Sequence, residues 1–467
     1  MHKIKIGEEE LFANEGELLS GLLMKNGKSI DHPCGGRGVC GKCTVIVNGK
    51  EELSCKYKVH SDITVSFPEK GEITSVSGAK ESGKVTDNTC FVLDIGTTTL
   101  ALAMVSLDEK QIIKVVTRSN PQRVFGADIM SRIDYCAKNS VKDLNDVIIE
   151  QINEMIAEFG QKEIEMLYVS ANTTMLHLFF NVDCSSIGVA PYTPAFLDSR
   201  YTEASELGLK GVKRVMGLPS ISSFVGADLV SGLNYVGFPK KDKYNLLIDL
   251  GTNAEIILFT EGDVLCTAAA AGPCFEGANI SCGMSATAGA IYAFSFDEKG
   301  EKRVSTISDA PAIGICGTGL IDVMAELVRN GTIDESGVMD DDYMIENEVM
   351  LSRQDIRQFQ LAKSAVYSAI FALMNLRNVT VDMIEKMYIS GGFSAKINIQ
   401  NAVDTGLLPK ELMDRCVAIN NSSLLGAFKY ACEGNDLSVY LDNAEYVDLS
   451  SDAAFTELFV ENMFFSL

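Results

Sequence analysis

The chain has 467 residues, which is enough for two or three domains with sizeable cores. Its formal net charge of −23 argues against a nucleic-acid partner, because phosphate binding requires clustered Lys and Arg. Residues 1–10 lack a charged-then-apolar signal and no apolar run approaches a membrane span, so we expect a soluble cytoplasmic protein with no membrane partner.

Cysteine is used in two ways along the chain. Thirteen cysteines, an odd number without an export signal, argue against a disulfide framework. Nine are scattered among mostly apolar neighbours and are expected to be small core residues: Cys90, Cys136, Cys184, Cys266, Cys274, Cys282, Cys316, Cys416 and Cys432. The other four, Cys34, Cys40, Cys43 and Cys55, lie close together near the N-terminus.

Residues 1–67 are predicted to form a small domain. Residues 2–6 alternate as a strand, residues 10–12 suggest a hairpin return, and residues 18–24 suggest a helix. The four close cysteines follow with the spacing C-x5-C-x2-C-x11-C. Four thiolates are the ligand set of an iron–sulfur cluster, and a glycine-rich loop lets bare N–H groups point at the sulfurs. The spacing therefore indicates an iron–sulfur site.

Hairpin geometry selects the fourth ligand. Asn48-Gly49 is the preferred two-residue hairpin turn. If this turn sets the register, the count back brings Cys55 level with Lys42, directly beside Cys43. Adjacent strands lie about 4.8 Å apart, so Cys55 is expected where a cluster ligand belongs. Cys90 is the alternative fourth ligand, but it lies beyond a flexible stretch.

A zinc site is the alternative to a cluster, although zinc sites usually offer two C-x-x-C pairs. The cysteine loop resembles that of plant- or adrenodoxin-type ferredoxins, which implies a 2Fe–2S cluster. The fourth cysteine comes earlier here than in those electron carriers. Residues 68–89, rich in Gly, Ser, Lys and Glu, are predicted to be a flexible linker that tethers this domain to the rest.

The motif Asp94-Ile95-Gly96-Thr97-Thr98-Thr99 lies between two apolar runs, and Asp249-Leu250-Gly251-Thr252-Asn253-Ala254-Glu255 repeats the pattern. Each predicts a strand, a glycine turn and a second strand. Glycine lets the backbone approach an anion, Thr hydroxyls can bind phosphate oxygens, and a carboxylate at a strand end can hold Mg²⁺ through water. A single copy also fits an ordinary hairpin. Two copies, each opening a half of similar length, suggest a duplicated domain that clamps a nucleotide.

A third motif, Ser390-Gly391-Gly392-Phe393, follows another apolar strand. The order resembles the phosphate-1, phosphate-2 and adenosine motifs of the actin, sugar-kinase and heat-shock-chaperone (ASKHA) superfamily. That resemblance implies ATP binding, with Mg²⁺ positioned by Asp94 and Asp249 and adenosine held by residues 391–393. The phosphate-binding residues that it implies are Gly96, Thr97, Thr98, Thr99, Gly251, Thr252 and Asn253.

Four further positions are left with two interpretations each. Asp228 opens a small-residue helix and either faces the nucleotide water or has a capping or surface role. Gln360 and Lys363, on a helix predicted over 354–377, either contact adenosine or are simply solvated. His177 is expected to be a core residue rather than a ligand. The small-residue segment 266–280 is expected to line the nucleotide site.

The sequence resembles one family within this superfamily more specifically. The ordered segments NPQRVFGADIMSRI, ANTTMLHLFF, FVGADLVSGL, DLGTNAE, AAAAGPCFEGANISCGM, GICGTGLIDVMAEL, DIRQFQLAKSA and SGGFSAKINIQNAVDTGLLP resemble the reductive activators of corrinoid proteins. These are ferredoxin-plus-actin-like ATPases of anaerobes, and the resemblance covers nearly the entire chain. Ala254 replaces the more usual Gly and Cys274 sits where Ala is common. Family members also carry more structured chain between cluster and ATPase.

The resemblance implies an α/β fold: a β-grasp 2Fe–2S domain over 1–67 and a duplicated actin-like (ASKHA, ribonuclease H-like) ATPase with halves 90–245 and 246–467. It implies ATP-dependent transfer of one electron to the Co(II) cofactor of a corrinoid protein in a methyltransferase system, regenerating Co(I). Asp249 or Asp228 would be the hydrolytic base. The implied partners are that corrinoid protein, a low-potential ferredoxin or flavoprotein as electron donor, and a second copy in a homodimer.

Three other functions compete with this one. An activase of a radical acyl-CoA dehydratase shares the ATP clamp but uses a 4Fe–4S cluster that bridges two subunits. A small-molecule kinase needs no cluster. A non-enzymatic redox sensor or an actin-like filament would bind ATP without reducing another protein.

Overall fold

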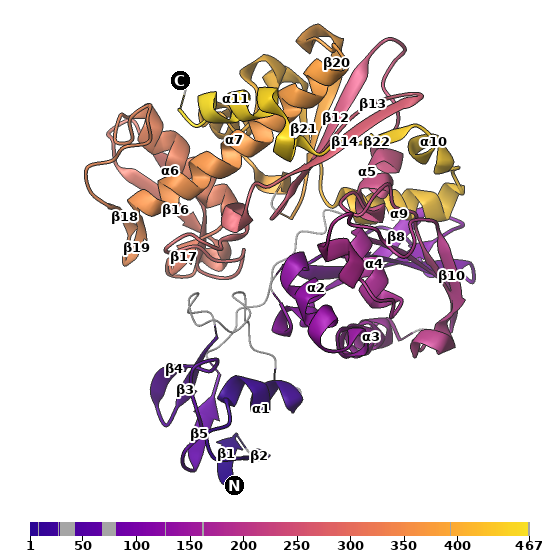
Figure 1. Cartoon of the computed structure of the whole chain (residues 1–467), viewed down its shortest axis with the longest axis vertical. Coiled ribbons are helices and arrows are strands. Elements are labelled where there is room, and N and C mark those ends of the chain that lie inside the picture. Colours follow the sequence, from indigo (N-terminus) through magenta and orange to yellow (C-terminus); the bar gives the residue numbers. More distant parts are fainter. Residues whose placement is uncertain are drawn as a thin grey trace.

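The computed structural model describes residues 1–7, 9–26, 28, 43–67, 81–126, 128–160, 163–392 and 394–465. Figure 1 shows a small N-terminal unit and two larger α/β lobes. Within the described part of the chain, every helix is too short or too polar to span a bilayer.

The N-terminal unit is a five-stranded sheet with one helix packed against it. Its elements are β1 (His2–Ile6), β2 (Glu9–Ala13), α1 (Leu19–Lys25), β3 (Thr44–Val47), β4 (Lys50–Leu53) and β5 (Ile63–Ser66), in the sheet order β2-β1-β5-β3-β4. Leu19 and Leu23 of α1 pack on Ile4, Val45 and Val65 of the sheet in one buried core. This is the arrangement expected of a β-grasp domain.

The first lobe is built on a six-stranded sheet in the order β10-β11-β9-β6-β7-β8. Its strands are β6 (Thr89–Ile95), β7 (Thr99–Ser106), β8 (Gln111–Ser119), β9 (Ile164–Ala171), β10 (Arg200–Glu203) and β11 (Val212–Gly217). Its helices are α2 (Ile129–Lys138), α3 (Val141–Ala157), α4 (Thr173–Phe179) and α5 (Ala227–Val236). Figure 1 shows α2, α3 and α4 grouped together beside the sheet.

The second lobe carries an equivalent sheet in the order β21-β20-β12-β13-β14-β22. Its strands are β12 (Tyr244–Leu250), β13 (Ala254–Thr260), β14 (Asp263–Ala269), β20 (Ile384–Ser390), β21 (Cys416–Ala418) and β22 (Ala444–Tyr446). Its helices are α7 (Arg353–Leu376), α8 (Ile399–Asp404), α9 (Ser422–Glu433), α10 (Ser438–Leu441) and α11 (Ala453–Glu461).

An insertion between β14 and α7 forms a smaller subdomain of the second lobe. It contains β15 (Ala290–Phe296), β16 (Lys302–Thr306), β17 (Gly314–Ile315), α6 (Gly317–Arg329), β18 (Tyr343–Glu346) and β19 (Val349–Leu351). Helix α6 packs across β15. In Figure 1 this subdomain extends to one side of the main sheet.

The two lobes repeat one topology. In each, the first strand pairs antiparallel with the second, the second pairs antiparallel with the third, and the fourth lies parallel beside the first. A further parallel strand leads into the helix that faces the other lobe, β11 into α5 and β21 into α9. The predicted duplication is thus present in the structure.

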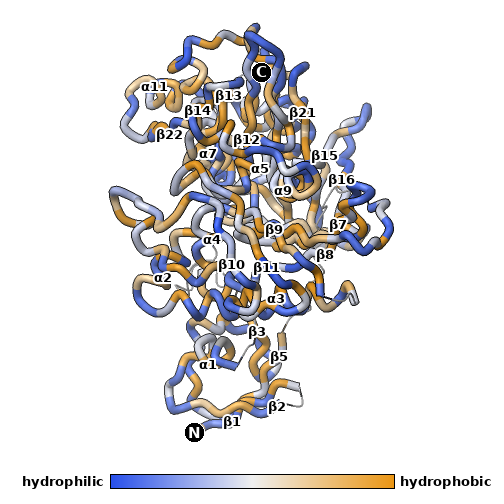
Figure 2. The backbone as a smooth tube through the Cα atoms, turned by 90° about the vertical axis from the view of Figure 1, so that its right-hand side faces the viewer, coloured by the Kyte–Doolittle hydropathy of each residue, from blue (hydrophilic) through white to orange (hydrophobic). Residues whose placement is uncertain are grey.

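The helices α5 and α9 cross in close contact between the lobes. A Cβ atom added to Gly426 of α9 would lie 1.7 Å from the carbonyl oxygen of Ser231 on α5, and one added to Gly232 of α5 would lie 3.1 Å from the Ser422 hydroxyl oxygen of α9. The Asn234 amide also donates to the Gly426 carbonyl at 2.9 Å. Small residues here let the two backbones meet, and Figure 2 shows α5 and α9 beside each other from a second direction.

Part of the predicted linker is packed on the first lobe. The backbone N–H groups of Ser82 and Gly83 both bond the Ile112 carbonyl of β8, and Glu81 accepts from the Val115 N–H at 2.8 Å. Residues 68–80 of the expected tether lie outside the described residues.

His177 is the core residue that the sequence predicts. It is fully buried in α4, with Nδ1 2.7 Å from the Thr173 carbonyl oxygen and Nε2 3.0 Å from the Ala195 N–H. Because Nε2 must accept that bond, the ring is neutral, and burial also lowers the pKa of His177.

Candidate functional site

Both glycine turns close as tight backbone loops at the ends of equivalent strands. The Gly96 N–H donates to the Thr99 carbonyl at 2.9 Å, and the Gly251 N–H donates to the Asn253 carbonyl at 3.1 Å. A Cβ on Gly96 would stand 2.8 Å from the Thr99 oxygen, so the first turn requires glycine. The threonines of this turn, Thr97 and Thr98, are partly exposed, and the Thr97 hydroxyl accepts from the Asn172 amide at 3.5 Å.

The first turn is supported from beneath by polar side chains of its own lobe. Arg132 of α2 is fully buried and donates to the Thr97 carbonyl at 2.5 Å and to the Gly126 carbonyl at 2.9 Å. Asn120 donates to the Gly96 carbonyl at 2.8 Å. Burial, followed by the nearby charge of Arg123, lowers the pKa of Arg132 to about 9. These contacts fix the Gly96 and Thr97 carbonyls and so hold the turn in one conformation.

Asp94, at the end of β6, is held by the opposite lobe. Its two carboxylate oxygens accept from the Asn421 amide at 2.8 Å and the Ser423 hydroxyl at 2.7 Å, both at the start of α9. Burial raises the pKa of Asp94, and the two hydrogen bonds oppose that rise. Sequence reasoning missed Asn421 and Ser423, since Asn-Asn-Ser-Ser before a helix is also an ordinary N-cap; Asn421 does cap α9 through the Leu424 N–H.

Asp228 and Asp249 are two further buried carboxylates, one from each lobe, close enough for the charge of Asp249 to act on Asp228. Burial, then the charges of Asp94 and Glu276, raise the pKa of Asp249 to about 7. Burial, then the charges of Asp249 and Asp94, raise the pKa of Asp228 to about 8. Asp228 is in the first turn of α5 and Asp249 ends β12 of the other lobe. The structure therefore brings the three predicted aspartates together.

Two glutamates complete the acidic group, and the sequence analysis did not single them out. Glu255 pairs with Asp249 across β12 and β13, and burial followed by the charge of Asp249 raises its pKa well above the usual value. Glu276 accepts from the Thr252 hydroxyl at 2.7 Å, and its pKa is raised chiefly by burial. Like charges directly opposed in a sheet are destabilising unless a cation is shared. The sequence feature that could have identified Glu276 as a site residue is its position inside the small-residue segment 266–280, which was expected to line the nucleotide site.

The Gly-Gly motif lies against the second turn. Gly391 has φ +117°, and a Cβ there would lie 2.4 Å from the Leu250 carbonyl oxygen and 3.1 Å from Asp249 Oδ1. A side chain at this position is excluded twice, by conformation and by space. Gly392 has open space around it, and Phe393 lies outside the described residues.

Gln360 and Lys363 lie on α7, where the structure gives their side chains other partners. Gln360 Nε2 donates to the Ser336 and Met463 carbonyls, both at 2.9 Å. Lys363 Nζ donates to the Asn462 and Phe464 carbonyls at 2.7 and 2.6 Å. Both are buried, contrary to the solvated alternative, and both fasten the C-terminal segment. The proposed adenosine contacts of these two residues therefore have no support from the geometry.

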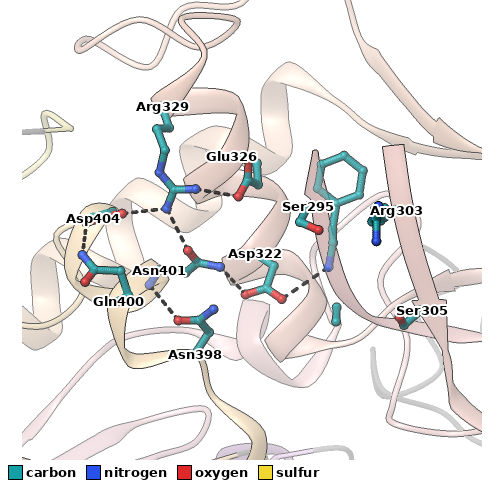
Figure 3. A pocket seen from close by; sticks show the side chains of 12 residues that line it. Ser295, Arg303, Ser305, Asp322, Glu326, Arg329, Asn398, Gln400, Asn401 and Asp404 are labelled. Atoms are coloured by element: carbon teal, nitrogen blue, oxygen red, sulfur yellow. Dashed lines mark hydrogen bonds and ion pairs between the residues drawn. The ribbon is translucent and has the colours of Figure 1, made fainter. Parts of the chain in front are cut away.

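A polar pocket of about 600 Å³ lies between α6, α8 and β15. Figure 3 shows Arg329 donating to Glu326, Asp404 and Asn401, at 2.5, 2.6 and 2.8 Å. The Asn401 amide in turn donates to Asp322 at 2.7 Å. Because these charges are paired with one another, the group acts as a polar joint between the two helices.

Two of the four predicted cluster cysteines lie within the described residues, and their thiols are in contact. Cys43 Sγ donates to Cys55 Sγ at 3.2 Å, and both residues are buried. The hairpin register is the predicted one, with Val47 opposite Lys50 and the Ser54 N–H bonded to the Cys43 carbonyl.

Cys34 and Cys40 lie outside the described residues. Within the described part of the chain, no group of three or more His, Cys, Asp or Glu side chains is placed to hold a metal ion. Cys90, the alternative fourth ligand, is buried in β6 of the first lobe, and burial raises its pKa to about 12. A pair of buried thiols in contact fits two ligands of an iron–sulfur cluster, whose sulfurs must converge on shared iron.

Comparison with known proteins agrees with this architecture. The family model described as the C-terminal domain of RACo, the ASKHA domain, matches residues 243–467, and the model of the RACo middle region matches residues 89–241. The chain is 28% identical over 421 residues to a corrinoid activation enzyme, RamQ, of Eubacterium limosum, covering 80% of this chain and 70% of that protein. It is 26% identical over 393 residues to a Co(II) methylated amine-specific corrinoid protein reductase of Methanosarcina barkeri, covering 76% and 72%.

A solved structure titled as a reductive activator for corrinoid, iron–sulfur protein is also similar. It superposes with a TM-score of 0.72 at 26% identity, covering 100% of this chain and 98% of that one. The two family models together take in both lobes, and the solved structure extends the likeness to the N-terminal unit. The chain therefore belongs to the family of reductive activators of corrinoid proteins, with an ASKHA fold.

Proposed function

We propose that this protein is an ATP-dependent reductive activator that passes one electron from a 2Fe–2S cluster to the Co(II) corrinoid of a methyltransferase corrinoid protein, regenerating Co(I). The observation that carries the proposal is the interlobe aspartate group, Asp94, Asp228 and Asp249, beside two phosphate-type turns, on the same chain as the Cys43–Cys55 thiol pair. A nucleotide clamp and an electron carrier on one chain fit a coupled reductase.

The nucleotide would lie between the two turns. Thr97, Thr98, Thr99, Thr252 and Asn253 would bind the phosphates on the two turns that Gly96 and Gly251 close, and residues 391–393 would meet adenosine. Mg²⁺ fits the acidic group, because carboxylate oxygens are its preferred protein ligands and several of these carboxylates face one another at high pKa. Bound there, Mg²⁺ would neutralise phosphate charge.

One carboxylate of the group is left to orient the attacking water. Asp94 is occupied by Asn421 and Ser423, whereas Asp228 Oδ1 accepts from the Leu229 N–H at 2.9 Å. With a pKa of about 8, Asp228 is mostly protonated at pH 7, and its ionised form is the more basic for the raised pKa. We therefore favour Asp228 as the base and Asp249 as the metal-positioning residue. Phosphoryl transfer depends mostly on such positioning and charge.

The two lobes are joined in a way that would let nucleotide binding change their relation. Each lobe presents a helix start to the aspartate of the other, α9 to Asp94 and α5 to Asp249. Closing around a nucleotide would use both contacts at once. Such coupling is typically worth about 1–3 kcal/mol, against about 2.3 kcal/mol per electron for each 100 mV of uphill transfer. Plant-type clusters lie near −400 mV.

The N-terminal unit would hold the cluster through Cys34, Cys40, Cys43 and Cys55. Bound there, the cluster would supply reversible one-electron storage. A low-potential ferredoxin or flavoprotein would reduce the cluster again after each transfer. The protein would work as a homodimer. The family resemblance supports both the electron donor and the second copy.

The test is an anaerobic absorbance assay with a Co(II) corrinoid protein, cluster-loaded protein, a reductant and Mg·ATP. We expect the Co(II) band to disappear only when all components are present. Loss of the band without ATP would contradict the nucleotide clamp. ATP consumption that needs a small-molecule hydroxyl acceptor would indicate a kinase, and nucleotide binding with no change in any acceptor would indicate a sensor.

A further inference from the structure

Arg132 of α2 is a buried cation whose hydrogen-bond partners are all neutral. Its side chain is fully buried. The guanidinium donates to the Thr97 carbonyl at 2.5 Å, the Gly126 carbonyl at 2.9 Å, the Met175 sulfur at 3.1 Å and the Gln122 amide oxygen at 3.4 Å. Among the described residues, no Asp or Glu oxygen lies within the ion-pair distance of 4.0 Å from this guanidinium.

A guanidinium in these surroundings is unfavourable by itself. Burying a charge away from water is costly, and the cost is offset only when an opposite charge stands close. Arg377 follows this rule, because it bonds two carboxylates, at 3.1 and 2.5 Å. For Arg132, burial and then the charge of Arg123 lower the pKa to about 9, although the charges of Asp128 and Glu276 oppose the change. The protein thus holds a positive charge that its own described residues do not neutralise.

The charge lies directly behind the first phosphate turn. The shortest hydrogen bond of Arg132 is the one to the Thr97 carbonyl. In a trans peptide the carbonyl and the N–H of the next residue point in opposite directions, so the Thr98 N–H is directed away from the guanidinium. A cation on the carbonyl also polarises the peptide and strengthens that N–H as a donor. The positive charge is therefore transmitted to the opposite face of the turn.

We propose that Arg132 is a fixed counter-charge for the phosphates of the nucleotide and makes the site prefer a nucleoside triphosphate to a monophosphate. It is a positioning residue, because it contacts the turn and acts on the phosphates through the Thr97–Thr98 peptide. Phosphates bound on the turn would supply the negative charge that the described residues do not place beside the guanidinium. This inference rests on the proposed nucleotide site, and it adds that charge, as well as hydrogen bonding, sets the affinity there.

The test measures the affinities of the full-length, cluster-loaded protein for Mg·ATP and for AMP by calorimetry, in the natural chain and in two variants. Arg132→Gln removes the charge and keeps an amide that can donate, whereas Arg132→Lys shortens the side chain and keeps the charge. We expect the ratio of ATP to AMP affinity to fall at least about fivefold in Arg132→Gln and less than about twofold in Arg132→Lys. Equal falls in the two variants would overturn the role of charge, because loss of hydrogen bonds alone predicts that result.

A matched control separates the effect of charge from general destabilisation. Arg377→Gln breaks the ion pairs of an arginine in the second lobe, so it should lower the thermal midpoint and leave the ratio of the two affinities as in the natural chain. An unchanged ratio in folded Arg132→Gln would overturn the proposal. If Arg132→Gln does not fold, Arg132→Lys decides, since a fivefold fall of the ratio in that variant would also overturn it. Absence of ATP binding by the natural chain would refute the proposed function instead.

Discussion

The carboxylate of Asp94, at the end of β6, accepts a hydrogen bond at 2.7 Å from the hydroxyl of Ser423, which lies 329 residues later at the start of α9. The same hydroxyl lies 2.8 Å from that of Ser170 on β9, so one side chain of the second lobe bonds two strands of the first. The metal-positioning residue that we propose for one lobe is thus oriented by the other. Any change in lobe separation must alter the carboxylate on which Mg·ATP would depend.

Replacing Asp94 by Asn should abolish productive Mg·ATP binding while preserving the fold. The amide keeps the shape and can still bond Asn421 and Ser423, but it lacks the negative charge that a cation requires. We expect ATP turnover to fall on the order of 100-fold, with a thermal midpoint equal to or above that of the natural chain. The control is Asp297→Asn, which removes a carboxylate from a remote turn. Turnover within twofold of the natural chain in Asp94→Asn would refute the role.

The acidic group predicts an unusual dependence of stability on pH. Asp228 and Asp249 have folded pKa values of about 8 and about 7, far above their usual value near 4, so the folded protein binds more protons than the unfolded chain between those limits. Their contribution to the free energy of unfolding is therefore full below about pH 4 and is lost as pH rises toward about 8.

Denaturant titration of the nucleotide-free protein at pH 6, 7 and 8 measures this dependence. We expect the Asp228→Asn variant to lose less stability than the natural chain between pH 6 and pH 8. Its excess stability should be greatest at pH 8, where like-charge repulsion is strongest. Parallel curves for the two proteins would mean that Asp228 does not titrate in this window.

The crossing of α5 and α9 predicts a severe effect of one methyl group. Gly426→Ala places a Cβ atom 1.7 Å from the Ser231 carbonyl oxygen, which the helices can relieve only by separating. We expect a loss of at least about 2 kcal/mol in the free energy of unfolding. Gly21→Ala in α1 is the matched control, because its Cβ meets nothing within 4 Å and alanine favours a helix. Equal stability of the two variants would contradict the close crossing.

The thiol contact predicts which cysteines hold the cluster. Cys43→Ala and Cys55→Ala should each lose the visible absorbance of the cluster after anaerobic reconstitution with iron and sulfide, because a missing ligand opens the site. Cys90→Ala should keep it, since Cys90 is buried in the first lobe. Full absorbance in Cys55→Ala together with its loss in Cys90→Ala would move the fourth ligand to Cys90.

Local patterns predicted the parts of the fold that depend on neighbours in sequence. The Asn48-Gly49 turn predicted the hairpin register because both residues must adopt positive φ, as they do at 49° and 81°. The repeated Asp-x-Gly-Thr motif predicted the duplication, because an apolar strand, a glycine turn and a second strand are local events. The same patterns brought Asp94 and Asp249 into the site.

The parts of the site that the sequence did not predict depend on contacts between segments that are distant along the chain. Ser423 and Glu276 join the site only through the packing of lobes and of the 266–280 segment, which no periodicity encodes. For Lys363 the sequence left two interpretations, an adenosine contact or plain solvation. In the structure its ammonium donates to the Asn462 and Phe464 carbonyls, about a hundred residues later. Helical periodicity predicts the face of the helix on which a side chain lies, but it does not predict which distant segment packs on that face.

The most direct test of the central claim is a single-turnover reaction in which the cluster is reduced beforehand, excess reductant is removed, and the protein is mixed anaerobically with a Co(II) corrinoid protein. The proposed electron transfer predicts that the cluster band of the reduced protein returns to its oxidised form as Co(II) is lost, mole for mole, when Mg·ATP is added and not with a non-hydrolysable analogue alone. Co(II) that disappears equally without nucleotide, or a cluster that stays reduced while ATP is consumed, would contradict it.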